Sequence, residues 1–348
     1  MNSTDTEDYD LASPFLFTPG GVRLVQIQPT LQCNLRCRHC YSESSPEHHE
    51  VIPLRKLQGF LLEAGHLGYN YVGVSGGEPL LWRDLENFLE FALAEGFSTS
   101  VSTNGTLLNR VRAERLRDLT GLVAVSVDGP PKDHAAIRDS PTAFPMMQAG
   151  LSVLREAGIP FTLAFTLTRY NADRLSWLYE FACKEGASGL HVHPLSGTGA
   201  AARNLLDAVP DSIEFQVAAL LMALLIEQRG PGGPAVIFDV IKRDTVEHNC
   251  WPLLRNETEA IRTAAFTELV PSLVVEPDGC IVPFTYGFPR QWSLGAIDEQ
   301  PLAEAAEKWR IASSPPVAEL IQVTLERMEG LRAEYFDLFG ELMITTLD

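Results

Sequence analysis

The chain has 348 residues, of which 45% are hydrophobic, a length and composition that suit one large domain with a smaller one beside it. Its formal net charge of −18 argues against broad binding to nucleic acid, because phosphate contacts need a basic surface. The acidic first ten residues are no signal peptide and no apolar stretch is long enough to span a membrane, so we expect a cytoplasmic protein with no membrane partner.

The first elements of the chain alternate between strand and helix. Residues 1–21 are acidic and then rich in proline and glycine, and we interpret them as an N-terminal tail. Residues 22–29 alternate and are rich in β-forming residues, which predicts the first strand. Apolar side chains at helical spacing predict helices over 54–67 and 84–95, and a short strand is predicted between them at 71–74.

A unit then repeats along the chain: a helix that ends in Glu and Gly, followed by a strand. It passes through Gly96, Gly158 and Gly186 into predicted strands at 97–103, 160–168 and 189–193, and another strand is predicted at 122–127. Including the first two, we count six strands. Strands that alternate with helices of this length form a parallel sheet with right-handed crossovers.

The repeat stops at the Gly/Pro-rich residues 229–234, after a predicted helix at 212–228. Beyond it, residues 273–283 contain an Asp-Gly turn and are predicted to form a β-hairpin, and 302–311 and 317–336 are predicted to be helices. We therefore predict a main domain over 22–229 and a smaller α+β domain over 230–348.

Three cysteines follow the first predicted strand with the spacing C-x3-C-x2-C: Cys33, Cys37 and Cys40. Three thiolates can hold three corners of a [4Fe–4S] cluster and leave the fourth iron open. Zinc is a rival, with His39 as a fourth ligand on spacing alone, although zinc sites usually pair C-x2-C units. Unrelated buried cysteines are the third alternative. Six cysteines with three of them clustered do not indicate a disulfide framework.

Polar residues follow three further predicted strands, at 75–79 (SGGEP), 102–106 (STNGT) and 126–129 (SVDG). A diglycine at the end of a strand lets the backbone approach a ligand closely. Asn-Gly is also a common turn. The carboxyl ends of barrel strands meet at one rim, where active sites lie, so these segments are candidate site residues.

The cysteine motif, with Tyr41 beside its last cysteine, resembles that of the radical S-adenosylmethionine (SAM) enzymes, and the resemblance extends over about residues 22–200. It implies a partial (β/α)6 barrel, one [4Fe–4S] cluster on Cys33, Cys37 and Cys40, and SAM bound to the open iron. It also implies a set of SAM-binding residues: Tyr41, Gly76, Gly77, Glu78, Pro79, Thr103, Asn104, Ser126, Asp128, Arg138 and Leu195.

Two of these assignments have a specific form. By resemblance Arg138 pairs with the SAM carboxylate, for which a planar guanidinium is well shaped, and the backbone near Leu195 contacts adenine. His191 and His193 share one face of a predicted strand. They can bind a metal, act as acid and base, or be structural.

The C-terminal region carries a second resemblance. Residues 276–284 and 294–297 are similar to the hairpin of the SPASM domain, or of its shorter twitch form, whose members carry auxiliary clusters. Phe284 stands where a ligand cysteine is expected. The remaining Cys183, Cys250 and Cys280 lack cluster spacing, so we expect a degenerate domain without an auxiliary cluster.

The resemblance implies reductive cleavage of SAM to a 5′-deoxyadenosyl radical that abstracts hydrogen from a substrate, with a low-potential donor such as a flavodoxin or ferredoxin. It points most to modification of a ribosomally synthesised peptide. The alternatives are a small molecule (a sugar, nucleoside or amino-acid derivative) and a glycyl radical on a partner enzyme. A non-catalytic iron–sulfur or zinc-binding partner protein is the alternative outside enzymology.

Overall fold

The computed structural model describes residues 21–346, so the predicted tail lies outside it except for residue 21. The strands are β1 Leu24–Ile27, β2 Tyr71–Val74, β3 Ser98–Thr103, β4 Leu122–Ser126, β5 Phe161–Leu167, β6 Gly189–Pro194, β7 Ala235–Phe238, β8 Ile241–Lys242, β9 Ser272–Val275, β10 Ile281–Pro283 and β11 Tyr335–Phe336. The helices are α1 Leu54–His66, α2 Leu85–Ala94, α3 Arg110–Leu116, α4 Pro131–Arg138, α5 Ala143–Ala157, α6 Leu175–Glu185, α7 Gly199–Asn204, α8 Ser212–Arg229, α9 Arg243–His248, α10 Pro252–Arg255, α11 Thr258–Thr263, α12 Phe266–Leu269, α13 Leu302–Ala312, α14 Ser314–Gly330 and α15 Leu338–Thr345. Among the described helices, none is long and apolar enough to cross a membrane.

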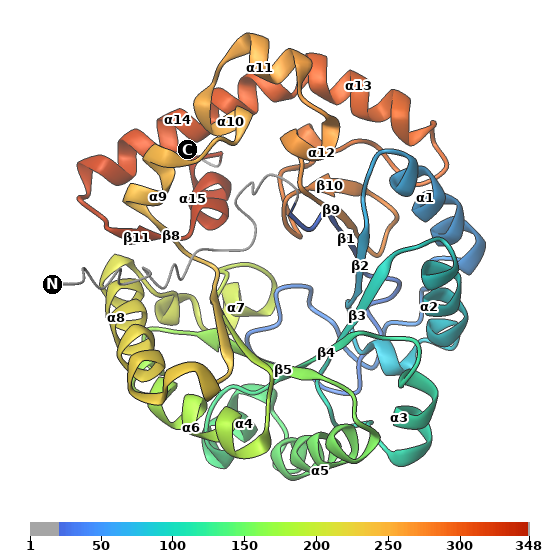
Figure 1. The fold of residues 1–348 in the computed structure, drawn as a ribbon, viewed down its shortest axis with the longest axis vertical. Coiled ribbons are helices and arrows are strands. Elements are labelled where there is room, and N and C mark those ends of the chain that lie inside the picture. The colour runs from blue at the N-terminus through green and yellow to red at the C-terminus, as the bar shows by residue number, and fades with distance from the viewer. Residues whose placement is uncertain (1–20, 347–348) are drawn as a thin grey trace, which may run out of the picture.

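A curved parallel sheet forms the centre of the molecule, and helices form a ring around it (Figure 1). Strands β1 to β6 lie side by side in chain order and every neighbouring pair among them is parallel. Strands joined through helices pair in parallel because the crossover returns the chain to the same end of the sheet. This arrangement confirms the predicted partial (β/α)6 barrel.

Both ends of this sheet are extended by the C-terminal part of the chain. Strand β7 pairs in parallel with β6, and β9 pairs in parallel with β1 and antiparallel with β10. The predicted hairpin at 273–283 is thus confirmed, and it lies beside the first strand. The division of the chain at residue 229 stays a prediction.

The predicted helix at 317–336 was wrong at its end. Helix α14 stops at Gly330, and residues 335–336 form β11, which pairs antiparallel with β8. Arg332 adopts a φ of 54°, a left-handed conformation that does not continue an α-helix. The apolar spacing of 317–336 could not show this turn, because it comes from the backbone and not from the side-chain pattern.

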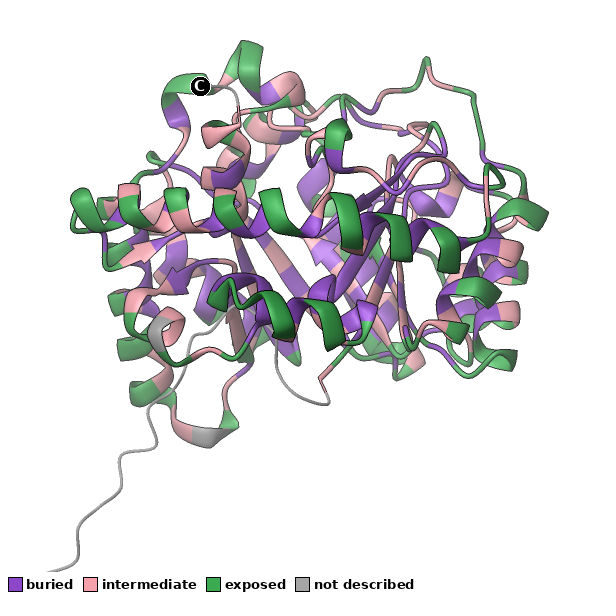
Figure 2. Cartoon of the chain, turned by 90° about the horizontal axis from the view of Figure 1, so that it is seen from above, coloured by how far each residue is buried: buried purple, intermediate pink, exposed green. Residues whose placement is uncertain are grey.

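Side chains on the two faces of the sheet differ in size and polarity. The residues that point toward the helices are fully buried and aliphatic, as in Val25, Ile27 and Val123. Toward the carboxyl ends of the strands, the residues that alternate with them are small or polar and line the interior, as Ala124 and Ser126 of β4 do. Figure 2 shows the buried strands behind helices whose outer faces are exposed. Small inward side chains cannot fill a barrel of this width, so its interior contains a cavity.

Candidate active site

A cavity of about 420 Å³ opens on the carboxyl-terminal side of the sheet, and the thiols of Cys33, Cys37 and Cys40 all line it. All three cysteines are free of disulfides. The volume falls within the range of ordinary small-molecule sites. One cavity therefore brings together the three residues that the sequence singled out.

The cysteine loop is held in place by backbone hydrogen bonds to distant parts of the chain. The N–H of Cys33 donates to the Ser45 carbonyl at 3.1 Å, and the N–H of Arg38 donates to the Ile137 carbonyl at 2.9 Å. The carbonyl of Cys40 accepts from the N–H of Ala200 at 2.9 Å, on α7. The loop is thus fixed from three directions, which sets the positions of its thiols.

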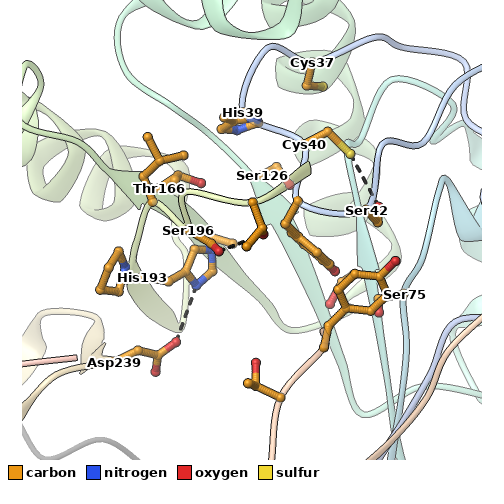
Figure 3. Close-up of a pocket in the computed structure, with 18 of the residues that line it drawn as sticks. Cys37, His39, Cys40, Ser42, Ser75, Ser126, Thr166, His193, Ser196 and Asp239 are labelled. Carbon is orange, nitrogen blue, oxygen red and sulfur yellow. Dashed lines mark hydrogen bonds and ion pairs between the residues drawn. The ribbon is translucent and has the colours of Figure 1, made fainter. Parts of the chain in front are cut away.

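Each cysteine sulfur has a hydrogen-bond donor within reach. The Arg138 guanidinium lies 3.6 Å from the sulfur of Cys37, the N–H of Ser44 lies 3.3 Å from that of Cys40, and the N–H of Leu35 lies 3.5 Å from that of Cys33. Figure 3 shows Cys40 directed toward Ser42, whose hydroxyl is 3.4 Å from the sulfur. Donors of this kind stabilise sulfur that carries negative charge.

Two of the bare thiols are poor acids. Burial raises the pKa of Cys33 to about 12 and also raises the pKa of Cys37. Buried thiols at neutral pH are therefore protonated, and a metal that binds them displaces those protons. The donor set of three sulfurs, each with a nearby donor, fits an iron–sulfur cluster.

A single zinc ion fits this site less well. Among the described residues, the three cysteine sulfurs do not all lie within 4.8 Å of one another; the one group of three His, Cys, Asp or Glu side chains that does so lies elsewhere. Tetrahedral zinc needs thiolate sulfurs about 3.8 Å apart, given Zn–S bonds of about 2.3 Å. His39, the candidate fourth ligand, directs its Nε2 to Asp128 at 3.2 Å.

The two glycines after β2 contact the cysteine loop as well as the cavity. Gly76 adopts a φ of 106°, and a Cβ atom there would lie 2.6 Å from the Thr30 carbonyl oxygen. A Cβ on Gly77 would lie 2.1 Å from the carbonyl oxygen of Gln32, the residue before Cys33. Only glycine permits this approach of two backbone segments. Both glycines line the cavity.

Glu78 and Pro79 do not line the cavity. The Glu78 carboxylate is fully buried and accepts from the Thr103 hydroxyl at 2.7 Å and the Asn104 N–H at 2.9 Å. Burial raises its pKa. Pro79 begins a short 3₁₀ turn at 79–81. Glu78 therefore ties the end of β3 to the end of β2 and positions Thr103 and Asn104.

Thr103 and Asn104 line the cavity, and Asn104 reaches the cysteine loop. Its amide nitrogen donates to Asn34 at 2.9 Å and lies 3.9 Å from the sulfur of Cys33. Ser126, Arg138, Tyr41 and Leu195 line the same cavity. Most of the predicted SAM-binding residues are thus brought together, and their individual roles stay predictions.

Asp128 lies behind the cavity wall, where it binds Arg138. The distance from Arg138 Nε to the Asp128 carboxylate is 2.6 Å, and both side chains are nearly inaccessible to solvent. Burial opposes the ionisation of Asp128, but Arg138 and His39 outweigh it and hold its pKa well below the usual range. Asp128 thereby fixes the guanidinium that contacts Cys37.

Several cavity residues were missed by the sequence reasoning. Thr166 and Ser196 follow the same rule as the predicted residues, because they lie at or just after the ends of β5 and β6, and strand ends alone could have indicated them. Asp239 follows β7, a strand that no pattern predicted. Tyr286 packs edge-on against Tyr41 with ring centroids 4.9 Å apart, a contact between residues distant in sequence.

Next to Asp128, the buried His134 predicts a pH-dependent stability. Its Nδ1 accepts from the Asp128 N–H at 3.2 Å, and burial lowers its pKa from 6.5 to about 4. The unfolded chain binds the proton more readily, so stability is full above about pH 6.5 and falls by roughly 3 kcal/mol as the pH drops to about 4.

Urea unfolding at several pH values measures this effect. His134→Asn keeps an acceptor for the Asp128 N–H, and we expect it to flatten the pH dependence in this window even if it lowers stability overall. His66→Asn is the matched control, because His66 lies exposed at the end of α1. An unchanged slope in His134→Asn would contradict the assignment.

Comparisons with known proteins agree with this site. The model of the radical SAM superfamily matches residues 27–182. The chain is 30% identical over 201 residues to the AdoMet-dependent heme synthase of Nitratidesulfovibrio vulgaris, covering 56% of this chain and 53% of that protein, where AdoMet is another name for SAM. It is 25% identical over 287 residues to the Fe-coproporphyrin III synthase of Methanosarcina barkeri, covering 79% of this chain and 71% of that protein.

The fold is also found among solved structures. Streptococcus suis SuiB bound to the precursor peptide SuiA superposes with a TM-score of 0.65 at 16% identity, covering 85% of this chain and 66% of that one. The chain spans about half the length of the first curated relatives that it matches. The matched region contains the cysteine loop and the strand ends around the cavity, and residues 27–182 of this chain form a domain of the radical SAM superfamily, whose members use a [4Fe–4S] cluster and SAM.

Proposed function

We propose that the protein is a radical SAM enzyme whose cluster is held by Cys33, Cys37 and Cys40. The observation that carries the proposal is the convergence of three free thiols, their hydrogen-bond donors and the glycine pair on one cavity. Cluster and SAM together would supply a 5′-deoxyadenosyl radical that abstracts hydrogen from the substrate. A low-potential flavodoxin or ferredoxin would supply the electron.

The protein's own residues have distinct tasks in this proposal. Arg138, Asn104 and the Ser44 N–H stabilise the negative sulfurs. The backbone of Gly76 and Gly77 and the side chains of Thr103 and Ser126 would contact SAM, with Tyr41 and Leu195 enclosing it. Arg138 would bind the SAM carboxylate through its terminal N–H groups, because its Nε–H already donates to Asp128. With substrate bound, the cavity wall would have to keep water and stray hydrogen donors from the radical.

We propose a peptide as the substrate because of the charges that face the cavity. Among the described lining residues Arg138 is the sole lysine or arginine, and it is already paired with Asp128. The opposite wall carries Asp239 and Asp337. Burial raises the pKa of Asp337 to about 7, which indicates how poorly this wall tolerates further negative charge. A neutral or cationic peptide segment suits such a cavity better than a polycarboxylate.

An iron tetrapyrrole is the second candidate substrate. The names of the two relatives above, a heme synthase and an Fe-coproporphyrin III synthase, favour it. This candidate fits the cavity less well, because a coproporphyrin has several carboxylates and the described lining residues include a single arginine to pair with them.

Anaerobic reconstitution, followed by reduction in the presence of SAM, tests the chemistry. We expect about four irons per chain and formation of 5′-deoxyadenosine, measured by mass spectrometry. About eight irons would show an auxiliary cluster and contradict the degenerate C-terminal domain. Bound zinc, or a cluster without SAM cleavage, would overturn the proposal in favour of a binding protein.

The same reaction distinguishes the substrates. A precursor peptide encoded beside the gene should increase 5′-deoxyadenosine formation and change in mass, whereas Fe-coproporphyrin III should do neither. Turnover of Fe-coproporphyrin III without turnover of the peptide would replace the first candidate with the second.

A further inference from the structure

Two histidines and one aspartate gather on the wall of the cavity away from the cysteine loop. His191 and His193 lie two residues apart on β6, so both point to the same face of the sheet. Asp239 follows β7, and its N–H donates to the Val192 carbonyl at 3.0 Å. Figure 3 shows His193 and Asp239 side by side, with Cys37 and Cys40 on the other side of the cavity. The two histidines are thus carried by a paired strand, and Asp239 is held against that strand by its own backbone hydrogen bond, which positions the ligands more precisely than a free loop would.

The ligand atoms are close enough for one metal ion. The distance from His191 Nε2 to Asp239 Oδ1 is 2.8 Å, and that from His193 Nδ1 to Asp239 Oδ2 is 3.6 Å. One ligand atom from each residue lies within 4.8 Å of the other two. Tetrahedral zinc with bonds of about 2.0–2.1 Å needs ligand atoms about 3.4 Å apart. Small side-chain rotations would therefore close the three atoms around an ion.

The charges at this wall favour a dication. The carboxylates of Asp239 and Asp337 both line the cavity. No lysine or arginine among the described lining residues other than Arg138 is present to balance these carboxylates.

The three side chains also remain accessible from the cavity. Their exposed fractions are 25% for His191, 37% for His193 and 19% for Asp239. Three protein ligands with accessible surface leave coordination positions for a further ligand, as in catalytic and not structural metal sites. Two imidazoles and one carboxylate select transition metals over Mg²⁺ or Ca²⁺, which prefer oxygen ligands alone.

We propose that His191, His193 and Asp239 bind one divalent transition-metal ion, such as Zn²⁺ or Fe²⁺, with an open coordination position that faces the cavity. An oxygen or nitrogen atom of the substrate would occupy this position and be oriented by it. The proposal goes beyond the radical chemistry and does not depend on it, because none of the three residues belongs to the cysteine loop. The competing explanation is a hydrogen-bonded His–Asp group with no affinity for metals.

The test removes the cysteine sulfurs first. The untagged full chain with Cys33, Cys37 and Cys40 replaced by serine is treated with a chelator and then titrated with Co²⁺. We expect one Co²⁺ per chain, with ligand-field bands of nitrogen and oxygen ligands and no sulfur-to-cobalt charge-transfer band. His193→Ala and Asp239→Asn in the same background should each weaken binding at least about 100-fold. His66→Ala is the matched control and should bind as the parent does.

A second measurement covers the case in which the serine variant does not fold. In the reconstituted protein with intact cysteines, plasma mass spectrometry after incubation with Zn²⁺ should find one zinc per chain, lost in His193→Ala while the iron content is unchanged. Absence of cobalt and zinc binding, or equal binding by His193→Ala, would overturn the proposal. If the parent protein failed to take up iron but still bound one zinc that His193→Ala loses, the cluster assignment alone would be contradicted, so the two proposals fail separately.

Discussion

Replacing Cys37 with alanine should abolish the cleavage of SAM, by at least about 1,000-fold or about 4 kcal/mol in activation free energy. Cys37 shares the cavity with Cys33 and Cys40 and lies 3.6 Å from the Arg138 guanidinium. With one thiolate missing, two cysteines remain for three cluster corners, so iron binding should fall together with activity. Iron per chain and 5′-deoxyadenosine after reduction are the two measurements.

The matched control for this variant is Cys183→Ala. Cys183 is a free, half-buried cysteine on α6 and does not line the cavity of the other three. We expect this variant to keep its iron and its activity. Full iron content and turnover in Cys37→Ala, or an equal loss in Cys183→Ala, would show that the cluster does not depend on the proposed ligands.

Replacing Gly77 with alanine should disrupt the site without touching any sulfur. The added Cβ would lie 2.1 Å from the carbonyl oxygen and 2.6 Å from the carbonyl carbon of Gln32. That carbonyl also accepts the Glu78 N–H at 2.8 Å, so neither segment is free to yield. We expect a loss of about 3 kcal/mol in the free energy of unfolding, and a melting temperature lower by roughly 6–12 °C.

The effect should extend to the cluster, because Gln32 immediately precedes Cys33. Iron loading should therefore fall together with the melting temperature. Gly59→Ala is the matched control: a Cβ there would meet nothing within 4 Å, and alanine should stabilise α1 by about 0.5–1 kcal/mol. Calorimetry and iron analysis of both variants measure these effects. A Gly77→Ala variant that melts at the parent temperature and holds its full iron would contradict the role of Gly77.

Local sequence was sufficient to predict those features of the structure that depend on interactions between residues close in the chain. The spacing of Cys33, Cys37 and Cys40 predicted a shared site, since residues so close in sequence occupy one loop. The alternation over residues 22–29 predicted β1, the repeated unit of helix, glycine and strand predicted most of the strands from β2 to β6, and the glycines after the helices predicted where the helices end. Gly158 and Gly186 indeed adopt φ values of 71°, which stop a helix.

The tertiary structure decided what depends on pairing between distant segments. The sequence predicted that Gly77 approaches a ligand, but the closest approach is to the backbone of Gln32, across a loop whose path no local pattern determines. Glu78 was expected to bind SAM, and the fold places it behind the cavity wall as the acceptor for Thr103 and Asn104.

Asp239 is the clearest example of a site residue that local sequence could not predict. His191 and His193 were visible as a pair, because alternate residues of a strand share a face. Their partner was not, because β7 is short, follows a Gly/Pro-rich break, and joins the sheet through its pairing with β6. The sequence by itself thus determined the cysteine site and the barrel that carries it. Only the packing of β7 against β6 brought Asp239 to the two histidines, since such contacts depend on long-range strand pairing that residue spacing does not encode.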